Sequence, residues 1–103
     1  MLDVERLDCL IGLCRDMVVR PSLSGEEWDV ADLIQKVMTN LGYDDVYVDR
    51  YGDVVGRIVF RKPGPTLLFE GHMDHVSPGD LSKWTVDPYG ATVADGKIFG
   101  RGT

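Results

Sequence analysis

The residues best suited to chemistry lie in the string EGHMDH at positions 70–75, which follows an apolar run. Side chains alternate along an extended strand, so we expect His72 and Asp74 on one face and His75 on the other. A neutral imidazole is a good ligand for zinc, and a carboxylate that accepts its second N–H fixes the tautomer. The string therefore offers one metal ligand, His72, and one orienting partner, Asp74, whereas catalytic zinc sites usually have three protein ligands.

Two amphipathic helices are predicted before this string. Apolar residues recur at three- and four-residue steps over 7–18, and Pro21 stops that helix. A second apolar face covers 31–41, and Gly42 follows it at the position for a left-handed helix end. The sequence SGEE at 24–27 fits a capping box, in which the serine accepts from a free backbone N–H and the second glutamate reaches back to the cap.

Short β-rich runs follow the second helix, at 46–48, 54–60, 66–70, 91–93 and 97–99. The run 66–70 begins with a continuous apolar stretch, which favours a central strand covered on both faces. The pair Asp95-Gly96 predicts a tight hairpin between the last two strands. The fold class is therefore α/β, with both helices covering a sheet and the string 70–75 at the C-terminal end of its central strand, where open α/β sheets place ligands.

Length and charge narrow the function classes. With 103 residues the chain forms one domain at most, and its net charge of −6 comes without a basic stripe that could neutralise phosphates. Nucleic acid is therefore excluded as a partner. No run approaches the roughly 20 apolar residues of a membrane span, and the acidic start does not fit a signal peptide, so we expect a cytoplasmic protein. Cys9 and Cys14 are expected to be buried, reduced thiols on one helix.

Three motifs together resemble a known family: TLLFEGHMDHVSPGD at 66–80, WTVDPYG at 84–90 and DGKIFGRG at 95–102. They are similar, in the same order, to the metallopeptidases that include acetylornithine deacetylase, succinyl-diaminopimelate desuccinylase, aminoacylase and glutamate carboxypeptidase. The upstream segments 21–27 and 52–56 also resemble the N-terminal region of that family. The resemblance covers nearly the whole chain.

The resemblance implies a three-layer αβα catalytic domain of zinc-peptidase type, of which residues 1–103 form only the N-terminal portion. It implies that His72 is a ligand of one zinc in a two-metal site and that Asp74 is the catalytic carboxylate that orients His72. Cobalt or manganese could substitute for zinc. The implied reaction is cleavage of an amide or peptide bond in a small N-acyl amino acid or short peptide by metal-activated water, in an enzyme that commonly dimerises. The other ligands would follow Thr103, so this chain alone is expected to be inactive.

Two rival readings stay open. His72, Asp74 and His75 also match part of the metallo-β-lactamase pattern, although Glu70 stands where that pattern needs its first histidine. The chain could instead be a non-catalytic αβ fragment or an interaction module. Other polar and aromatic residues have plainer interpretations: His75 as a hydrogen-bonded side chain, three aspartates as turn residues, and two aromatic residues as loop anchors. The aspartates are Asp80, Asp87 and Asp95, and the aromatic residues are Trp84 and Tyr89. Arg101 either fixes the hairpin or contacts a carboxylate.

Overall fold

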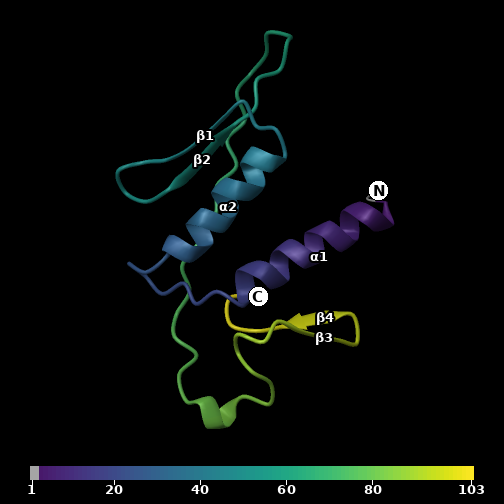
Figure 1. The fold of residues 1–103 in the computed structure, drawn as a ribbon, viewed down its shortest axis with the longest axis vertical. Helices are drawn as coiled ribbons and strands as arrows, with labels where there is room; N and C mark the ends of the chain where they lie inside the picture. Colours follow the sequence, from purple (N-terminus) through teal and green to yellow (C-terminus); the bar gives the residue numbers. More distant parts are fainter. Residues whose placement is uncertain (1–2) are drawn as a thin grey trace.

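A computed structural model describes residues 3–103 as two helices, two small sheets and a long extended segment (Figure 1). Strands β1 and β2 form one antiparallel pair, and β3 and β4 form another. The molecule measures 53 × 36 × 22 Å, with a radius of gyration of 15.9 Å. A compact chain of this length has a radius of gyration of roughly 13 Å, so the elements do not close into one globule. The elements are α1 (Val4–Val18), α2 (Trp28–Asn40), β1 (Asp45–Val48), β2 (Val54–Arg57), the 3-10 turn η1 (Leu81–Lys83), β3 (Thr92–Ala94) and β4 (Lys97–Phe99).

Helix α1 confirms the first predicted helix and begins three residues earlier than the periodicity indicated. Asp3 explains the early start, because its side chain accepts a hydrogen bond from the backbone N–H of Arg6 and caps the helix. Only Val18 is buried, since most of the apolar face has no element packed against it. The expectation of two buried thiols is therefore wrong for Cys9, which is exposed, while Cys14 is half-buried.

Helix α2 confirms the second predicted helix but not its predicted cap. Its N-cap is Glu27, with no side-chain hydrogen bond to the helix, and the Glu27 carboxylate accepts instead from the backbone N–H of Gly25. Ser24 does not cap the helix either, because its hydroxyl donates to Asp74. At the other end Gly42 has a φ of +80°, so the left-handed helix end is confirmed.

Helix α2 packs on the β1–β2 hairpin, and this is the best-formed part of the chain. Val30 and Ala31 on α2 are each 4% exposed. Opposite them Gly56 of β2 lies so close that an added Cβ would be 2.6 Å from Sδ of Met38 and 2.7 Å from the ring of Tyr43. The close approach of strand and helix therefore requires glycine at this position.

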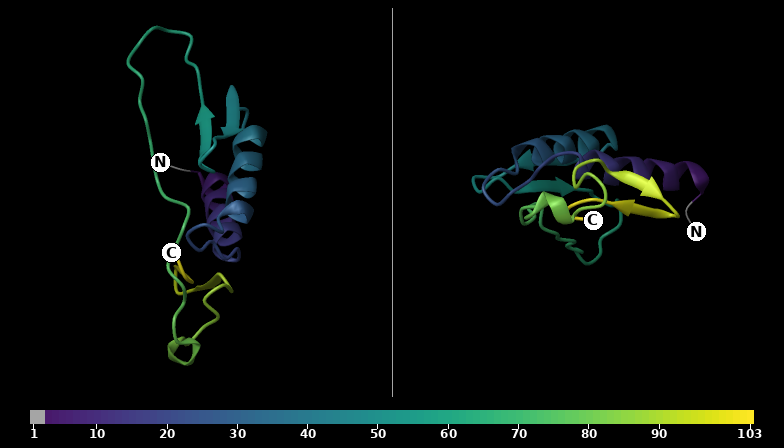
Figure 2. Two further views of the ribbon diagram at one scale, coloured as in Figure 1. Left: turned by 90° about the vertical axis from the view of Figure 1, so that its left-hand side faces the viewer. Right: turned by 90° about the horizontal axis from the view of Figure 1, so that it is seen from below.

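The predicted central strand at 66–70 is not a strand in this structure. Residues 58–80 form no helix or strand, and β2 ends at Arg57 rather than at Phe60. Figure 2 shows this segment as a long green arc that leaves the hairpin and returns past the helices. Leu68 and Phe69 are 88% and 89% exposed. The physical reason is that no strand among residues 3–103 pairs with the run, and an isolated strand has no ladder to hold it.

The β3–β4 hairpin confirms the predicted tight turn. Asp95 and Gly96 both have positive φ values, +51° and +72°, as a two-residue hairpin turn of this type requires. The hairpin lies beside α1 (Figure 1), where Nε of Arg15 donates to the carbonyl of Ala91 at 3.2 Å. Ala91 is fully buried at this junction.

Two helices with two small antiparallel sheets are compatible with part of an α/β domain. The predicted fold class is confirmed only in this coarse form by the described residues. The three-layer arrangement is not present among them, because the central strand that would carry it is not formed. Within residues 3–103, no helix has both the length and the apolar character that crossing a bilayer requires.

Candidate metal-binding site

The string 70–75 is held by the loop between α1 and α2 rather than by a sheet. The backbone N–H of His75 donates to the carbonyl of Ser22 at 2.8 Å, and the N–H of Ser22 donates to Nε2 of His75 at 2.9 Å. Ser22 is 1% exposed, so both bonds lie in a protected place. This reciprocal pair fixes the position of the string relative to the helices.

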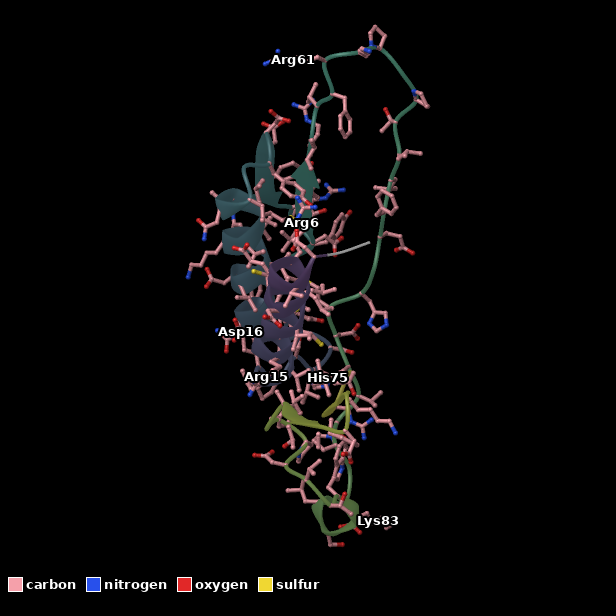
Figure 3. All side chains as sticks on the ribbon, turned by 90° about the vertical axis from the view of Figure 1, so that its right-hand side faces the viewer. Arg6, Arg15, Asp16, Arg61, His75 and Lys83 are labelled. Atoms are coloured by element: carbon pink, nitrogen blue, oxygen red, sulfur yellow. The ribbon has the colours of Figure 1, made fainter. Side chains whose placement is uncertain are left out.

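His75 is hydrogen-bonded through both ring nitrogens, as expected from the sequence. Since Nε2 accepts from Ser22, the proton must be on Nδ1, which lies 2.9 Å from the carbonyl of Val76. The ring also packs near Tyr89, with the ring centroids 5.7 Å apart. Figure 3 places His75 where the string passes the end of α1 and the β3–β4 hairpin. No lone pair of this imidazole is left for a metal.

His72 is arranged in the opposite way. Its Nδ1 lies 2.8 Å from the backbone carbonyl of Asp74 and 3.2 Å from Oδ1 of the Asp74 carboxylate. Both oxygens are acceptors, so Nδ1 carries the proton and Nε2 carries the lone pair. The side chain of His72 is 84% exposed, and its Nε2 makes no hydrogen bond to any residue in the described part of the chain. The Asp74 carboxylate therefore lies beside His72 as expected, although the hydrogen bond from Nδ1 goes to the backbone carbonyl of Asp74. In this tautomer Nε2 has the electronic form of a metal ligand.

Asp74 has a second partner that the sequence analysis did not identify. Oδ2 accepts a hydrogen bond from Oγ of Ser24 at 2.5 Å. This bond lowers the pKa of the Asp74 carboxyl below its ordinary value, and the neighbouring His72 lowers it further. The sequence assigned Ser24 to a helix cap, and the 50 residues between Ser24 and Asp74 give no local signal of their contact.

The three aspartates assigned to turns have the expected roles. Asp80 accepts from the backbone N–H and the hydroxyl of Ser82, which caps η1 and lowers the pKa of the Asp80 carboxyl. Asp87 accepts from the backbone N–H of Tyr89, and Asp95 forms the β3–β4 turn. None of the three faces His72.

Trp84 anchors the loop between η1 and β3, as expected. Its indole N–H donates to the carbonyl of Pro78 at 2.9 Å, and the Arg101 guanidinium stacks 5.0 Å from the ring centroid. The backbone N–H of Arg101 also donates to the carbonyl of Pro88 at 2.7 Å. Of the two roles considered for Arg101, fixing the loop and hairpin is therefore the one the structure shows.

A groove of about 620 Å³ runs beside His72 and Asp74, between α2, β2 and residues 68–74. Its lining includes apolar side chains of α2 as well as residues 51–56 and 68–74, and Glu27 also lines it. Among residues 3–103, no group of three His, Cys, Asp or Glu side chains is placed to hold a metal ion. The donor set therefore fits one ligand with its orienting carboxylate, which is part of a metal site and not a whole one.

An imidazole whose Nδ1–H faces a carboxylate is an arrangement that metal-ligating histidines commonly have. Comparison with known proteins finds relatives that are hydrolases. The chain is 38% identical over 94 residues to a succinyl-diaminopimelate desuccinylase of Cereibacter sphaeroides, and 33% identical over 99 residues to one of Rhodospirillum centenum. In both cases the match takes in 89% of this chain.

The chain spans about a quarter of the length of these curated relatives, 25% in each case, at their N-terminal end. The resemblance to the N-terminal portion of the acetylornithine deacetylase and desuccinylase family, predicted from the motifs, is therefore confirmed. No protein-family model and no solved structure matches the chain.

Proposed function

We propose that this chain is the N-terminal portion of a two-metal hydrolase that cleaves an amide or peptide bond in a small N-acyl amino acid or short peptide. The observation that carries the proposal is the His72–Asp74 pair, which leaves Nε2 of an exposed imidazole ready for a metal. Support for the reaction class comes from the relatives, which are named as desuccinylases. An N-succinyl amino acid is accordingly the substrate class to test first.

In this proposal His72 would hold one zinc ion and Asp74 would keep its imidazole in the Nδ1–H form. A bound metal of this kind polarises a carbonyl and lowers the pKa of a water molecule. Cobalt or manganese could take the place of zinc, since both accept imidazole and carboxylate ligands. The three-layer αβα domain, of which residues 1–103 would be one portion, and the homodimer of the whole enzyme belong to the same proposal.

The 103-residue chain by itself is proposed to be inactive. Its described residues offer one candidate ligand, and a catalytic zinc site usually has three. A non-catalytic αβ fragment or interaction module is the alternative, and the exposed apolar run at 67–69 is the observation in its favour. The metallo-β-lactamase pattern is disfavoured because His75, which it requires as a ligand, uses both ring nitrogens in hydrogen bonds.

Replacement of the two histidines tests the proposal directly. In the full-length protein we expect His72→Ala to lose one equivalent of zinc and to stop release of succinate from N-succinyl-diaminopimelate. His75→Gln is the matched control, because its ring already has other partners, and it should keep the metal. Metal content by atomic spectroscopy and the hydrolysis rate are the two measurements. Unchanged zinc and rate in His72→Ala would remove His72 from the site, and loss of zinc in His75→Gln would revive the metallo-β-lactamase reading.

Asp74→Asn tests the orienting role separately. The amide keeps the size of the side chain and removes the negative charge that lies beside Nδ1 of His72. Loss of such an orienting partner typically lowers metal affinity or activity by about 10–100-fold, and we expect a fall in that range. A zinc titration of the metal-stripped protein measures it. Unchanged affinity would show that Asp74 does not act on His72.

A further inference from the structure

We infer that Ser24 is a positioning residue for the metal-binding histidine and that it acts through Asp74. This inference rests on the proposed function, because it assigns Ser24 a task only if His72 binds a metal. Its basis is a chain of contacts through three side chains, one of them a hydrogen bond and the other an ion-pair contact. Oγ of Ser24 donates to Oδ2 of Asp74 at 2.5 Å, and Oδ1 of the same carboxylate lies 3.2 Å from Nδ1 of His72.

The two contacts use opposite oxygens of one carboxylate, and this determines its orientation. With Oδ2 held by Ser24, the plane of the carboxylate cannot turn freely, and Oδ1 stays beside the imidazole. The imidazole in turn keeps its proton on Nδ1 and its lone pair on Nε2. The loss of the Ser24 hydroxyl would leave Asp74 free to choose other rotamers, because an exposed side chain has little packing to restrain it.

The backbone carbonyl of Asp74 also lies 2.8 Å from Nδ1 of His72, but it does not restrain the Asp74 carboxylate. The side chains of His72 and Asp74 are 84% and 38% exposed, so packing restrains them weakly. Residues 58–71 before the pair have no strand partner among residues 3–103. By contrast, the loop that carries Ser24 is tied to the string by the two bonds between Ser22 and His75. Ser24 therefore extends from a fixed loop to the one carboxylate that faces His72.

The geometry also excludes a nucleophilic role for this serine. An activated serine donates its proton to an imidazole, and the carboxylate then supports the imidazole from behind. Here the Ser24 hydroxyl donates to the carboxylate, and His72 contacts that carboxylate from the other side. The base that contacts the Ser24 proton is the Asp74 carboxylate, and its lowered pKa makes it a poor general base. Its contribution is restraint of the carboxylate.

Two readouts test the inference, and one of them needs no metal. In the metal-free full-length protein, long-range ¹⁵N NMR of His72 reports which ring nitrogen carries the proton. We expect the native protein to show the Nδ1–H form and Ser24→Ala to shift His72 towards the Nε2–H form. Competition with a fluorescent chelator then measures zinc affinity. We expect Ser24→Ala to weaken binding by about 3- to 10-fold, less than the roughly 10–100-fold effect of a direct partner of the ligand, since it acts through one further residue.

Two further variants make the test specific. Ser24→Thr keeps the hydroxyl and should restore the tautomer and the zinc affinity to within about 2-fold of the native protein. Ser82→Ala is the matched control, because it also removes a serine hydroxyl that donates to an aspartate, Asp80 at 2.7 Å, away from the site. It should leave both readouts unchanged.

The outcomes separate this inference from the proposed function. If Ser24→Ala behaves like Ser82→Ala in both readouts, or if Ser24→Thr is as impaired as Ser24→Ala, the role of the hydroxyl is refuted. If His72→Ala keeps its full zinc content, the proposed function fails, and with it the assignment of Ser24 to a metal site. A shifted tautomer with weakened zinc binding in Ser24→Ala, both rescued by threonine, establishes the positioning role.

Discussion

The β1–β2 hairpin and the run at 66–70 have similar β-forming sequences and opposite structures. The hairpin pairs Val46 with Gly56 and Val48 with Val54 across a short loop, and α2 covers it. The run contains Leu68 and Phe69, yet it forms no strand, is unpaired among residues 3–103 and is almost completely exposed. A β-rich run becomes a strand only when a partner strand and a covering element are within reach, and β-propensity alone does not supply them.

The same difference separates the two histidines of the site. Like the hairpin, His75 has neighbours that fix its position. Like the run, His72 is exposed, and it is held by one residue only. An imidazole with both ring nitrogens hydrogen-bonded contributes to stability and has no lone pair available to a metal. A side chain that is oriented but exposed contributes little to stability and is available to a ligand. Substitutions in the two regions should therefore act on different properties.

The largest effect is expected from an added methyl group in the hairpin. Gly56→Ala places a Cβ 2.6 Å from Sδ of Met38 and 2.7 Å from the ring of Tyr43, so these side chains must shift. We expect a loss of about 1–3 kcal/mol in the free energy of unfolding, as for other overpacked sites. Gly64→Ala is the control in the extended segment, since nothing lies within 4 Å of its added Cβ. Urea denaturation measures both, and equal losses would refute the distinction between the two regions.

The next effect is expected at the two histidines. His75→Ala leaves the backbone N–H of Ser22 without its acceptor in a buried position, and we expect a loss of about 1–3 kcal/mol in the free energy of unfolding. His72→Ala removes a side chain that is 84% exposed and should change that free energy by no more than about 0.5 kcal/mol in the metal-free protein. Urea denaturation with metal removed checks both values. A larger loss in His72→Ala would show that His72 has a structural role that its exposure conceals.

The sequence predicted well what depends on near neighbours. Both helices follow from apolar periodicity, and the left-handed end at Gly42 and the turn at Asp95 follow from the chemistry of single residues. The closeness of His72 to the Asp74 carboxylate belongs to the same group, because the two residues are only two positions apart. Each of these features is decided within a few residues of chain.

What the sequence could not predict depends on distant partners. The residues around Ser24 match a helix-cap motif, but its hydroxyl donates instead to Asp74, 50 residues away. The exposure of Cys9 depends on which elements cover α1, and the state of the run at 66–70 depends on whether a strand pairs with it. Local patterns state what a segment favours and do not state whether its partner is present.

The smallest effect on stability, and the clearest on association, is expected in the run itself. Leu67, Leu68 and Phe69 are 76–89% exposed, so replacing them with serine removes few native contacts. We expect each substitution to change the free energy of unfolding of the 103-residue chain by no more than about 0.5 kcal/mol. Val55→Ser in β2, which is half-buried, is the control and should cost more.

Association should respond more strongly than stability. An exposed apolar stretch with unpaired backbone groups is a template for pairing with a second chain, so we expect the native 103-residue chain to self-associate. The triple serine variant should be mainly monomeric at the same concentration, because serine removes the apolar surface that drives the pairing. Sedimentation velocity over a range of concentrations measures the difference. A monomeric native chain, or a triple variant that loses more than about 2 kcal/mol, would show that the run is packed and that the contrast with the hairpin does not hold.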